Sequence, residues 1–157
     1  MSKLYILCGP SGSGKTTWAE KFMYENEDIR YVSRDDIRYS ILKEGEDYFA
    51  HEKEVFKKFV GTITETLIDG FDVIADATHL NEFSRRKLTQ AIDMRFTDYE
   101  IVYVVFSTSL ETCLERNSNR VGRKNVPETV IRNMFRDAKE PSYDEDERVI
   151  DIIEVGE

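Results

Sequence analysis

Residues 9–16 read Gly-Pro-Ser-Gly-Ser-Gly-Lys-Thr, which is the G-x-x-x-x-G-K-S/T spacing of a phosphate-binding loop. The mostly apolar residues 3–8 before the loop predict a buried strand, and residues 17–23 after it predict a helix. In such a unit the glycines allow several backbone N–H groups to face one anion, and the helix adds its positive N-terminal end. This combination predicts that the chain binds a nucleoside triphosphate here.

The residues of this loop have distinct expected tasks. The Lys15 ammonium carries a positive charge to the β- and γ-phosphates, and the Thr16 hydroxyl is placed to bind Mg²⁺. The alternative is a chance turn rich in glycine and serine. A chance turn would not be expected to have both a strand directly before it and a helix directly after it. The rest of the expected nucleotide-binding set within the loop is Gly9, Ser11, Gly12, Ser13 and Gly14.

Length and composition place the chain among soluble globular proteins. Its 157 residues are 40% hydrophobic and 34% charged, which suits one domain with a substantial core. No apolar run approaches the roughly 18 residues that a membrane span needs, so we expect a cytoplasmic protein without a membrane partner. Cys8 and Cys113 lie in apolar or helical contexts, and we interpret both as reduced core residues.

The charge of the chain is unevenly distributed. A net charge of −9 argues at first against a nucleic-acid partner, but residues 127–157 hold ten acidic and only four basic residues. Residues 116–124 hold four basic residues and no acidic one. A locally basic segment in an acidic protein suits contact with a few phosphates better than contact with a long duplex.

Four further apolar runs predict strands, at residues 28–33, 71–76, 100–106 and 149–155. Helical patterns separate them, and the longest covers residues 48–69. Alternating strands and helices imply an α/β protein with the P-loop NTPase fold, in which a parallel sheet of about five strands carries helices on both faces.

Candidate acceptor-side residues follow the second predicted strand. Because ligands sit at the carboxyl ends of parallel strands, Asp35 should lie at the sheet edge where the phosphate-binding loop opens. Its carboxylate could accept a proton from an attacking hydroxyl, and Arg38, three residues on, could hold an anionic group of the acceptor. Ser33 is expected to cap the following helix. For the two aspartates in its first turn, above all for Asp36, the alternative to a catalytic role is a favourable interaction with the helix dipole.

The third predicted strand also ends in an aspartate. Asp76 could hold Mg²⁺, directly or through water, or contact the acceptor. In the loop that follows, His79 is a lone histidine that we interpret as structural rather than substrate-binding, and Asn81 is a candidate helix cap. Arg85, Arg86 and Lys87 come early in that helix, where cations oppose the dipole and hint at an anion nearby.

A basic segment around residues 116–125 follows the fourth predicted strand and predicts a mobile lid. Thr108 and Glu111 could form a capping box for the helix that leads into it. Arg116 and Arg120 are four residues apart, share one face if the helix extends that far, and would reach the phosphates when the lid closes. A merely soluble basic loop is the alternative. After the lid, Pro127 suits a first helical position, and residues 140–147 are expected to form a turn with an acidic surface.

Taken together, these pieces resemble the kinase domain of phage-type 5′-polynucleotide kinases. The resemblance spans nearly the whole chain and rests on residues 9–16, 34–38 and 116–120, on the strand-end aspartate with Thr78, and on Val126-Pro127. It implies transfer of the γ-phosphate of ATP to a 5′-hydroxyl of DNA or RNA, with Mg²⁺. By resemblance Asp35 is the general base, Arg38 contacts the acceptor's phosphate and Arg120 meets the transferred group. The implied substrate-binding set is Asp35, Arg38, Asp76, Thr78 and Val126, with Arg116 and Arg120 on the nucleotide.

The chain also departs from that family's pattern. The aspartate of phage relatives falls one place later, at Ala77, and the segment between Arg120 and Val126 is one residue longer. Because the chain stops after the kinase domain, we expect residues 1–157 to form a single domain without a phosphatase. Two alternatives stay open. One is a small-molecule kinase acting on a nucleoside, nucleotide or sugar nucleotide, and the other is a non-catalytic nucleotide-binding switch.

Overall fold

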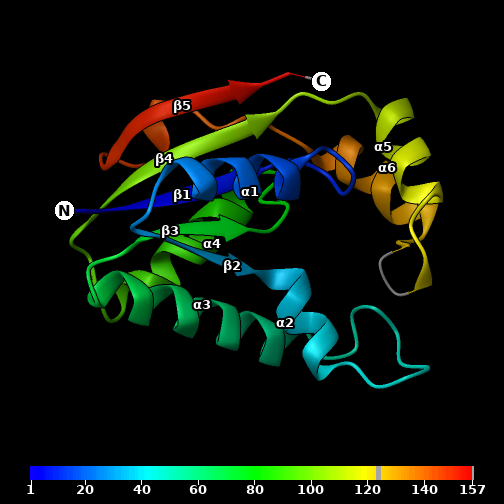
Figure 1. Ribbon diagram of the computed structural model, residues 1–157, viewed down its shortest axis with the longest axis horizontal. Helices are drawn as coiled ribbons and strands as arrows, with labels where there is room; N and C mark the ends of the chain where they lie inside the picture. The colour runs from blue at the N-terminus through cyan, green and yellow to red at the C-terminus, as the bar shows by residue number, and fades with distance from the viewer. Residues whose placement is uncertain (123–124, 157) are drawn as a thin grey trace.

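The computed structural model describes residues 1–122 and 125–156 and contains a five-stranded sheet (Figure 1). The strands lie in the order β2-β3-β1-β4-β5, and every neighbouring pair is parallel. The predicted α/β fold is therefore confirmed. The strands are β1 (Ser2–Cys8), β2 (Ile29–Ser33), β3 (Asp72–Asp76), β4 (Tyr99–Phe106) and β5 (Val149–Val155).

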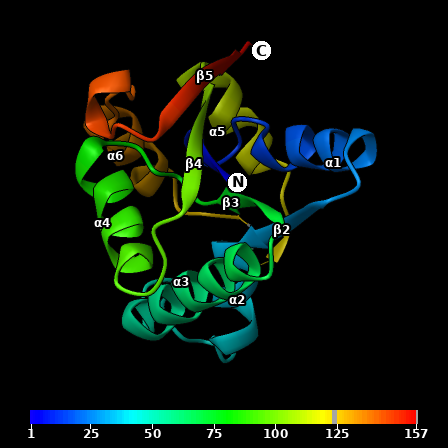
Figure 2. The ribbon, with the colours of Figure 1, turned by 90° about the vertical axis from the view of Figure 1, so that its left-hand side faces the viewer.

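Helices cover both faces of this sheet. Figure 2 shows α1 on one side and α3 and α4 on the other, while α5 and α6 pack together beyond the carboxyl ends of the strands (Figures 1 and 2). In the part of the chain that the structure describes, none of the helices is both long and apolar enough to span a membrane. The helices are α1 (Lys15–Glu25), α2 (Arg34–Ile41), α3 (Glu52–Ile68), α4 (Glu82–Asp93), α5 (Leu110–Ser118) and α6 (Glu128–Asp137), with a 3-10 turn η2 at Tyr143–Glu145.

The two faces of β1 show why the apolar runs predicted strands. Leu4 and Ile6 point into the core beneath α3 and α4, whereas Tyr5 and Leu7 point into the core beneath α1. A parallel strand buried on both faces needs apolar side chains at every position, not at alternate ones. Cys8 is buried in the first of these cores. Burial raises the pKa of its thiol to about 12.

The helix starts are set by side chains of the preceding loops. The Ser33 hydroxyl accepts a hydrogen bond from the Asp36 amide at 3.2 Å, and Asn81 forms a capping box with Ser84, so both expected caps are confirmed. The expected capping box of Thr108 and Glu111 is wrong. Ser109 caps α5 instead, because the Thr108 hydroxyl is used in a 2.8 Å hydrogen bond to the Ser13 carbonyl in the phosphate-binding loop.

Two further boundaries differ from the prediction by a few residues. The long helix expected from residue 48 begins at Glu52, because residues 45–51 form turns before it. Pro127 lies just before α6 as its N-cap, one position earlier than the first helical position expected for it.

Candidate active site

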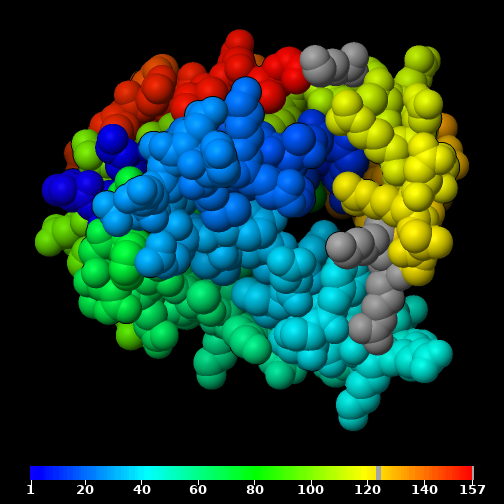
Figure 3. Space-filling model, in the orientation of Figure 1, coloured from blue at the N-terminus to red at the C-terminus, as the bar shows by residue number. Residues whose placement is uncertain are grey.

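A cleft of about 1230 Å³ lies at the carboxyl ends of β1, β2 and β3. Figure 3 shows it as a hollow between the N-terminal segment in blue, the α2 region in cyan and the α5 region in yellow. The phosphate-binding loop, Asp35, Asp76 and the two arginines of the predicted lid all line this one cleft. The structure therefore brings together most of the residues that the sequence singles out.

The phosphate-binding loop has the backbone that its glycines permit. Gly12 and Gly14 have φ values of +84° and +98°, in the left-handed region that other residues avoid. A Cβ at Gly12 would also lie 2.9 Å from the Cys113 carbonyl oxygen, so the loop and α5 approach too closely for a larger residue. Since α1 begins at Lys15, its positive N-terminal end faces the inside of the loop.

Two loop side chains are suited to phosphate oxygens. The Lys15 ammonium donates 2.9 Å hydrogen bonds to the carbonyls of Gly9 and Pro10, which holds it across the loop. Burial lowers the pKa of Lys15, and the nearby Asp76 carboxylate opposes that shift. The Ser13 hydroxyl is buried and has no hydrogen-bond partner among the described residues. A buried donor without a partner is costly, and a phosphate oxygen in the loop would satisfy it.

Oxygen ligands suited to Mg²⁺ lie beside the loop. The Tyr31 hydroxyl donates to the Asp76 carboxylate and also interacts with the Thr16 hydroxyl. The Asp76 and Thr16 oxygens therefore both lie next to the Tyr31 hydroxyl. Burial raises the pKa of Asp76, while the Lys15 charge acts in the opposite direction. The described residues contain no cluster of three or more His, Cys, Asp or Glu that would form a metal site alone. Mg²⁺ binds through one or two protein oxygens together with substrate phosphates, and Thr16 and Asp76 are the residues here that could supply such oxygens.

Asp35 is held by a cluster of polar side chains at the opposite wall. Its Oδ1 accepts a 2.6 Å hydrogen bond from the Tyr48 hydroxyl and forms an ion pair with Arg38. Its side chain nevertheless stays 45% exposed toward the cleft. A carboxylate that is oriented from behind and open in front can receive a proton from a hydroxyl placed in the cleft.

Arg38 is more deeply buried than its expected acceptor contact requires. Its side chain is 5% exposed, and its guanidinium binds Glu52 through two hydrogen bonds of 2.9 and 3.1 Å. It also donates to the Tyr48 hydroxyl at 2.7 Å and stacks over the Tyr48 ring. Arg38 therefore positions Asp35 in this structure. Sequence reasoning missed Tyr48 and Glu52, because each lies ten or more residues after Arg38 and carries no motif.

The lid arginines are anchored to the end of α5. Arg116 donates a 3.0 Å hydrogen bond to the Gly12 carbonyl, which ties α5 to the phosphate-binding loop. Arg120 is exposed, lines the cleft and is close enough to Lys15 to lower the pKa of that ammonium. Two other basic residues of the predicted lid, at positions 123 and 124, lie outside the described residues.

The structure places two of the expected substrate contacts, Thr78 and Val126, in different surroundings. Thr78 lines the cleft, and its carbonyl accepts the Gly9 amide at 2.9 Å, which fixes the entry to the phosphate-binding loop. Val126 does not line the cleft. Its side chain is buried between α5 and α6, and the Asn117 side chain binds its backbone at both the amide and the carbonyl.

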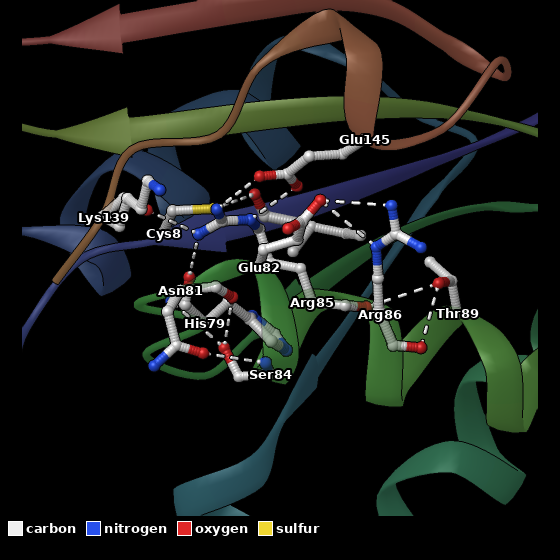
Figure 4. A network of polar contacts seen from close by, with 11 residues as sticks. Cys8, His79, Asn81, Glu82, Ser84, Arg85, Arg86, Thr89, Lys139 and Glu145 are labelled. Atoms are coloured by element: carbon white, nitrogen blue, oxygen red, sulfur yellow. Dashed lines mark hydrogen bonds and ion pairs between the residues drawn. The ribbon is translucent and has the colours of Figure 1, made fainter. Parts of the chain in front are cut away.

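Behind the cleft, a buried ion pair joins α4 to η2 (Figure 4). The Arg85 side chain is 1% exposed and donates to both oxygens of Glu145, at 2.9 and 2.6 Å. Its remaining nitrogen donates to the carbonyls of His79 and Lys139, each at 3.0 Å. Glu145 is therefore the anion that compensates Arg85, whereas Arg86 pairs with Glu82 on the surface. The expectation that residues 140–147 form only an acidic surface is wrong at this residue.

His79 belongs to the same buried cluster, because its backbone carbonyl accepts a hydrogen bond from Arg85. It is buried, its Nδ1 lies 2.9 Å from the Leu7 carbonyl, and its backbone has a φ of 41° that side-chain-bearing residues adopt rarely. Burial lowers the pKa of His79 to about 4. The imidazole is thus neutral near pH 7 and packs as a core residue against Phe59, in agreement with its structural interpretation.

Comparisons with known proteins bear on the family and the fold of the chain. The family model described as AAA domain matches residues 4–141 of the chain. A chain of the Pnkp1/Rnl/Hen1 RNA repair complex is 24% identical, with a TM-score of 0.73 over 87% of this chain and 43% of that one. A fungal RNA kinase is 14% identical, with a TM-score of 0.66 over 98% of this chain and 74% of that one. A sugar kinase from Janibacter sp. HTCC2649 is 16% identical, with a TM-score of 0.66 over 99% of this chain and 86% of that one.

These likenesses show a shared fold. The chain spans less than half the length of the RNA repair chain, at 43%, and nearly the whole length of the sugar kinase. The matching family model covers most of the sequence, including the phosphate-binding loop, Asp35 and the lid arginines. The chain belongs to the AAA domain family and has the fold of the P-loop kinases.

Proposed function

We propose that this protein is a polynucleotide kinase that transfers the γ-phosphate of ATP to the 5′-hydroxyl of DNA or RNA, with Mg²⁺, in nucleic-acid repair. The observation that carries the proposal is the Asp35 carboxylate, oriented by Arg38 and Tyr48 and open toward the cleft that also holds Lys15. The resemblance of residues 34–38 and 116–120 to phage-type 5′-polynucleotide kinases supports a 5′-hydroxyl as the acceptor.

The proposed reaction divides the residues between two walls of the cleft. The loop N–H groups and Lys15 bind the β- and γ-phosphates, while Asp35 accepts the proton of the attacking hydroxyl. The acceptor oxygen forms a bond to the γ-phosphorus as the bond to the β–γ bridging oxygen breaks, and ADP leaves. Arg120 meets the negative charge on the transferred group. Because such transition states are loose, positioning and charge stabilisation contribute more than proton removal.

Thr16 and Asp76 are the residues that would hold Mg²⁺. When bound, the ion neutralises charge on the phosphate oxygens. Asp76 is buried at the end of β3 and accepts a hydrogen bond from Tyr31, so it is less accessible to an acceptor than Asp35, which favours the metal role over the acceptor role.

A small-molecule kinase is the second candidate, since the sugar kinase matches over nearly the full length of both chains. A non-catalytic nucleotide switch needs no acceptor site, so the ordered carboxylate at Asp35 counts against it.

A direct assay separates these candidates. The protein is incubated with γ-labelled ATP, Mg²⁺ and either a 5′-hydroxyl oligonucleotide, nucleosides, mononucleotides or sugars. We expect transfer to the oligonucleotide. Efficient transfer only to a nucleoside or sugar would establish the second candidate, and ATP hydrolysis indifferent to every acceptor would establish the switch.

Lys15→Ala should lower this transfer by ~10³-fold or more, because it removes a preorganised charge from the phosphates. Lys58→Ala, an exposed lysine on α3 away from the cleft, is the matched control and should retain wild-type turnover. Near-normal turnover in Lys15→Ala would contradict the proposed kinase activity.

A further inference from the structure

Two large aromatic side chains stand exposed at the same cleft. Phe83, on α4, is 78% exposed, and Phe49, in the segment before α3, is 53% exposed, yet both line the cleft described above. Single exposed apolar residues are common on protein surfaces and need no explanation. Two exposed rings that line the same cleft as Asp35 are a candidate for contact with a flat ligand.

A cation accompanies these rings on α4. Lys87 is four residues after Phe83, so the two side chains share a face of the helix, and Lys87 also lines the cleft. Its ammonium lies 4.7 Å from the centre of the Phe56 ring on α3. Among the described residues, Lys87 forms no ion pair with any carboxylate.

The other cations of the acceptor wall are engaged to different degrees. Arg38 is occupied by Asp35, Glu52 and Tyr48. Arg34 pairs with Glu52 at 2.9 Å, although its Nε is buried without a hydrogen-bond partner among the described residues. The charge most available to a phosphate on this wall is therefore that of Lys87.

A second hollow continues from this part of the cleft. It measures about 340 Å³ and shares Phe49, Ser84 and Met134 with the larger cleft. A ligand that occupies the cleft beside α4 therefore has adjoining space in which to continue past Phe49. Such a path suits a chain of linked units better than a compact small molecule.

We propose that Phe83, Lys87 and Phe49 form a subsite for the single-stranded end of the acceptor. The aromatic rings stack on its unpaired bases, and Lys87 binds a phosphate of its backbone. This inference rests on the proposed function and deepens it by assigning a recognition surface outside the catalytic residues. Aromatic stacking together with a nearby cation is how proteins hold single strands without reading their sequence, and it requires bases that are not paired.

The test uses Phe83→Ala and Lys87→Met, with Tyr24→Ala and Lys58→Met as matched controls on exposed surface away from the cleft. The steady-state constants kcat and KM are measured for a 5′-hydroxyl single strand, a blunt duplex of the same sequence and a nucleoside 3′-monophosphate. The KM for ATP is measured in parallel. Phe83→Trp and Lys87→Arg serve as conservative variants that should restore the interaction.

We expect Phe83→Ala to raise the KM for the single strand by roughly 10-fold, on the scale of one lost base stack, with kcat and the KM for ATP little changed. Lys87→Met should reduce the slope of log affinity against log salt by about 0.7, the share of one phosphate contact on a single strand. The wild-type protein should prefer the single strand to the blunt duplex. Both controls should match the wild type.

The contrary outcomes are distinct. If the wild type phosphorylates the oligonucleotide while Phe83→Ala and Lys87→Met keep its KM and salt slope, the subsite is refuted and the proposed function stands. Defects confined to the KM for ATP, or equal loss with both conservative variants, would also refute it. If the wild type phosphorylates no 5′-hydroxyl nucleic acid, the proposed function fails and the subsite fails with it.

Discussion

Replacing Glu145 with Gln should destabilise the protein far more than the same change at its surface. The change leaves the shape of the side chain but removes the charge opposite Arg85, whose guanidinium is 1% exposed. Leaving a buried charge without its partner costs ~3–5 kcal/mol, and the lower end applies here because Gln can still accept one hydrogen bond. For a chain of this length, ~3 kcal/mol corresponds to a fall in Tm of roughly 6–12 °C.

Glu128→Gln is the matched control for this prediction. Glu128 pairs with Arg132 at 2.8 Å, four residues apart on the exposed surface of α6, so the chemical change is identical and only the burial differs. An exposed pair at that spacing contributes about 0.3–0.5 kcal/mol. Both variants are compared by denaturant unfolding at neutral pH, with the slope m checked for two-state behaviour.

Replacing both members of the buried pair should cost less stability than neutralising Glu145 alone. In the double variant Arg85→Met/Glu145→Met no buried charge is left alone, so part of the stability lost in Glu145→Gln should return. A free energy of unfolding for Glu145→Gln that lies within a few tenths of a kcal/mol of the value for Glu128→Gln would refute the argument. It would mean that Arg85 reaches solvent once its partner is neutral.

Three further predictions concern catalysis and pH. Asp35→Asn should lower single-turnover transfer to a 5′-hydroxyl oligonucleotide by ~10²–10⁴-fold while ATP still binds, because it removes the base and leaves the phosphate-binding loop intact; lost ATP binding would instead assign Asp35 to the metal or the fold. Arg120→Ala should cost roughly 10³-fold in the same assay, the scale of a charge that meets the transferred group, and unchanged transfer would remove it from that role. Because His79 has a pKa of about 4 when folded and an ordinary value of 6.5, the unfolded chain binds the extra proton first as the pH falls below 6.5. The free energy of unfolding should therefore drop by about 2 kcal/mol between pH 7.5 and pH 5 through this group, and His79→Gln should show a smaller drop in the same titration.

Most of the fold could be predicted from the sequence because its core is formed by parallel strands. The three inner strands β1, β3 and β4 are largely buried on both faces, so each appears as a mostly apolar run whose ends are set by polar loops, whereas the edge strands β2 and β5 are partly exposed. The error at α5 shows the limit of local rules. Thr108 and Ser109 are adjacent hydroxyl residues that either could cap a helix, and a bond from Thr108 to Ser13, 95 residues away in sequence, decides between them.

The residues that surround the candidate base were harder to predict. The phosphate-binding loop and Asp35 have a position and a motif, so their place at one sheet edge followed from the topology. Tyr48 and Glu52 have neither. They reach Asp35 and Arg38 only because the segment after α2 folds back over it, and a single sequence contains no local pattern that reports such a return.

Two buried arginines give two kinds of support to the site. Arg85 is the fourth residue of α4, near the end where the dipole disfavours a cation, whereas Arg38 lies in the last turn of α2, and each pairs with a glutamate from a later segment. Arg38 with Glu52 fixes the acceptor wall, since it binds Asp35 directly. Arg85 with Glu145 fixes the donor wall more remotely: it binds the His79 carbonyl, and the neighbouring Thr78 carbonyl holds the Gly9 amide at the entry to the phosphate-binding loop. Loss of the first pair should therefore disturb transfer more than ATP binding, whereas loss of the second should weaken ATP binding together with stability.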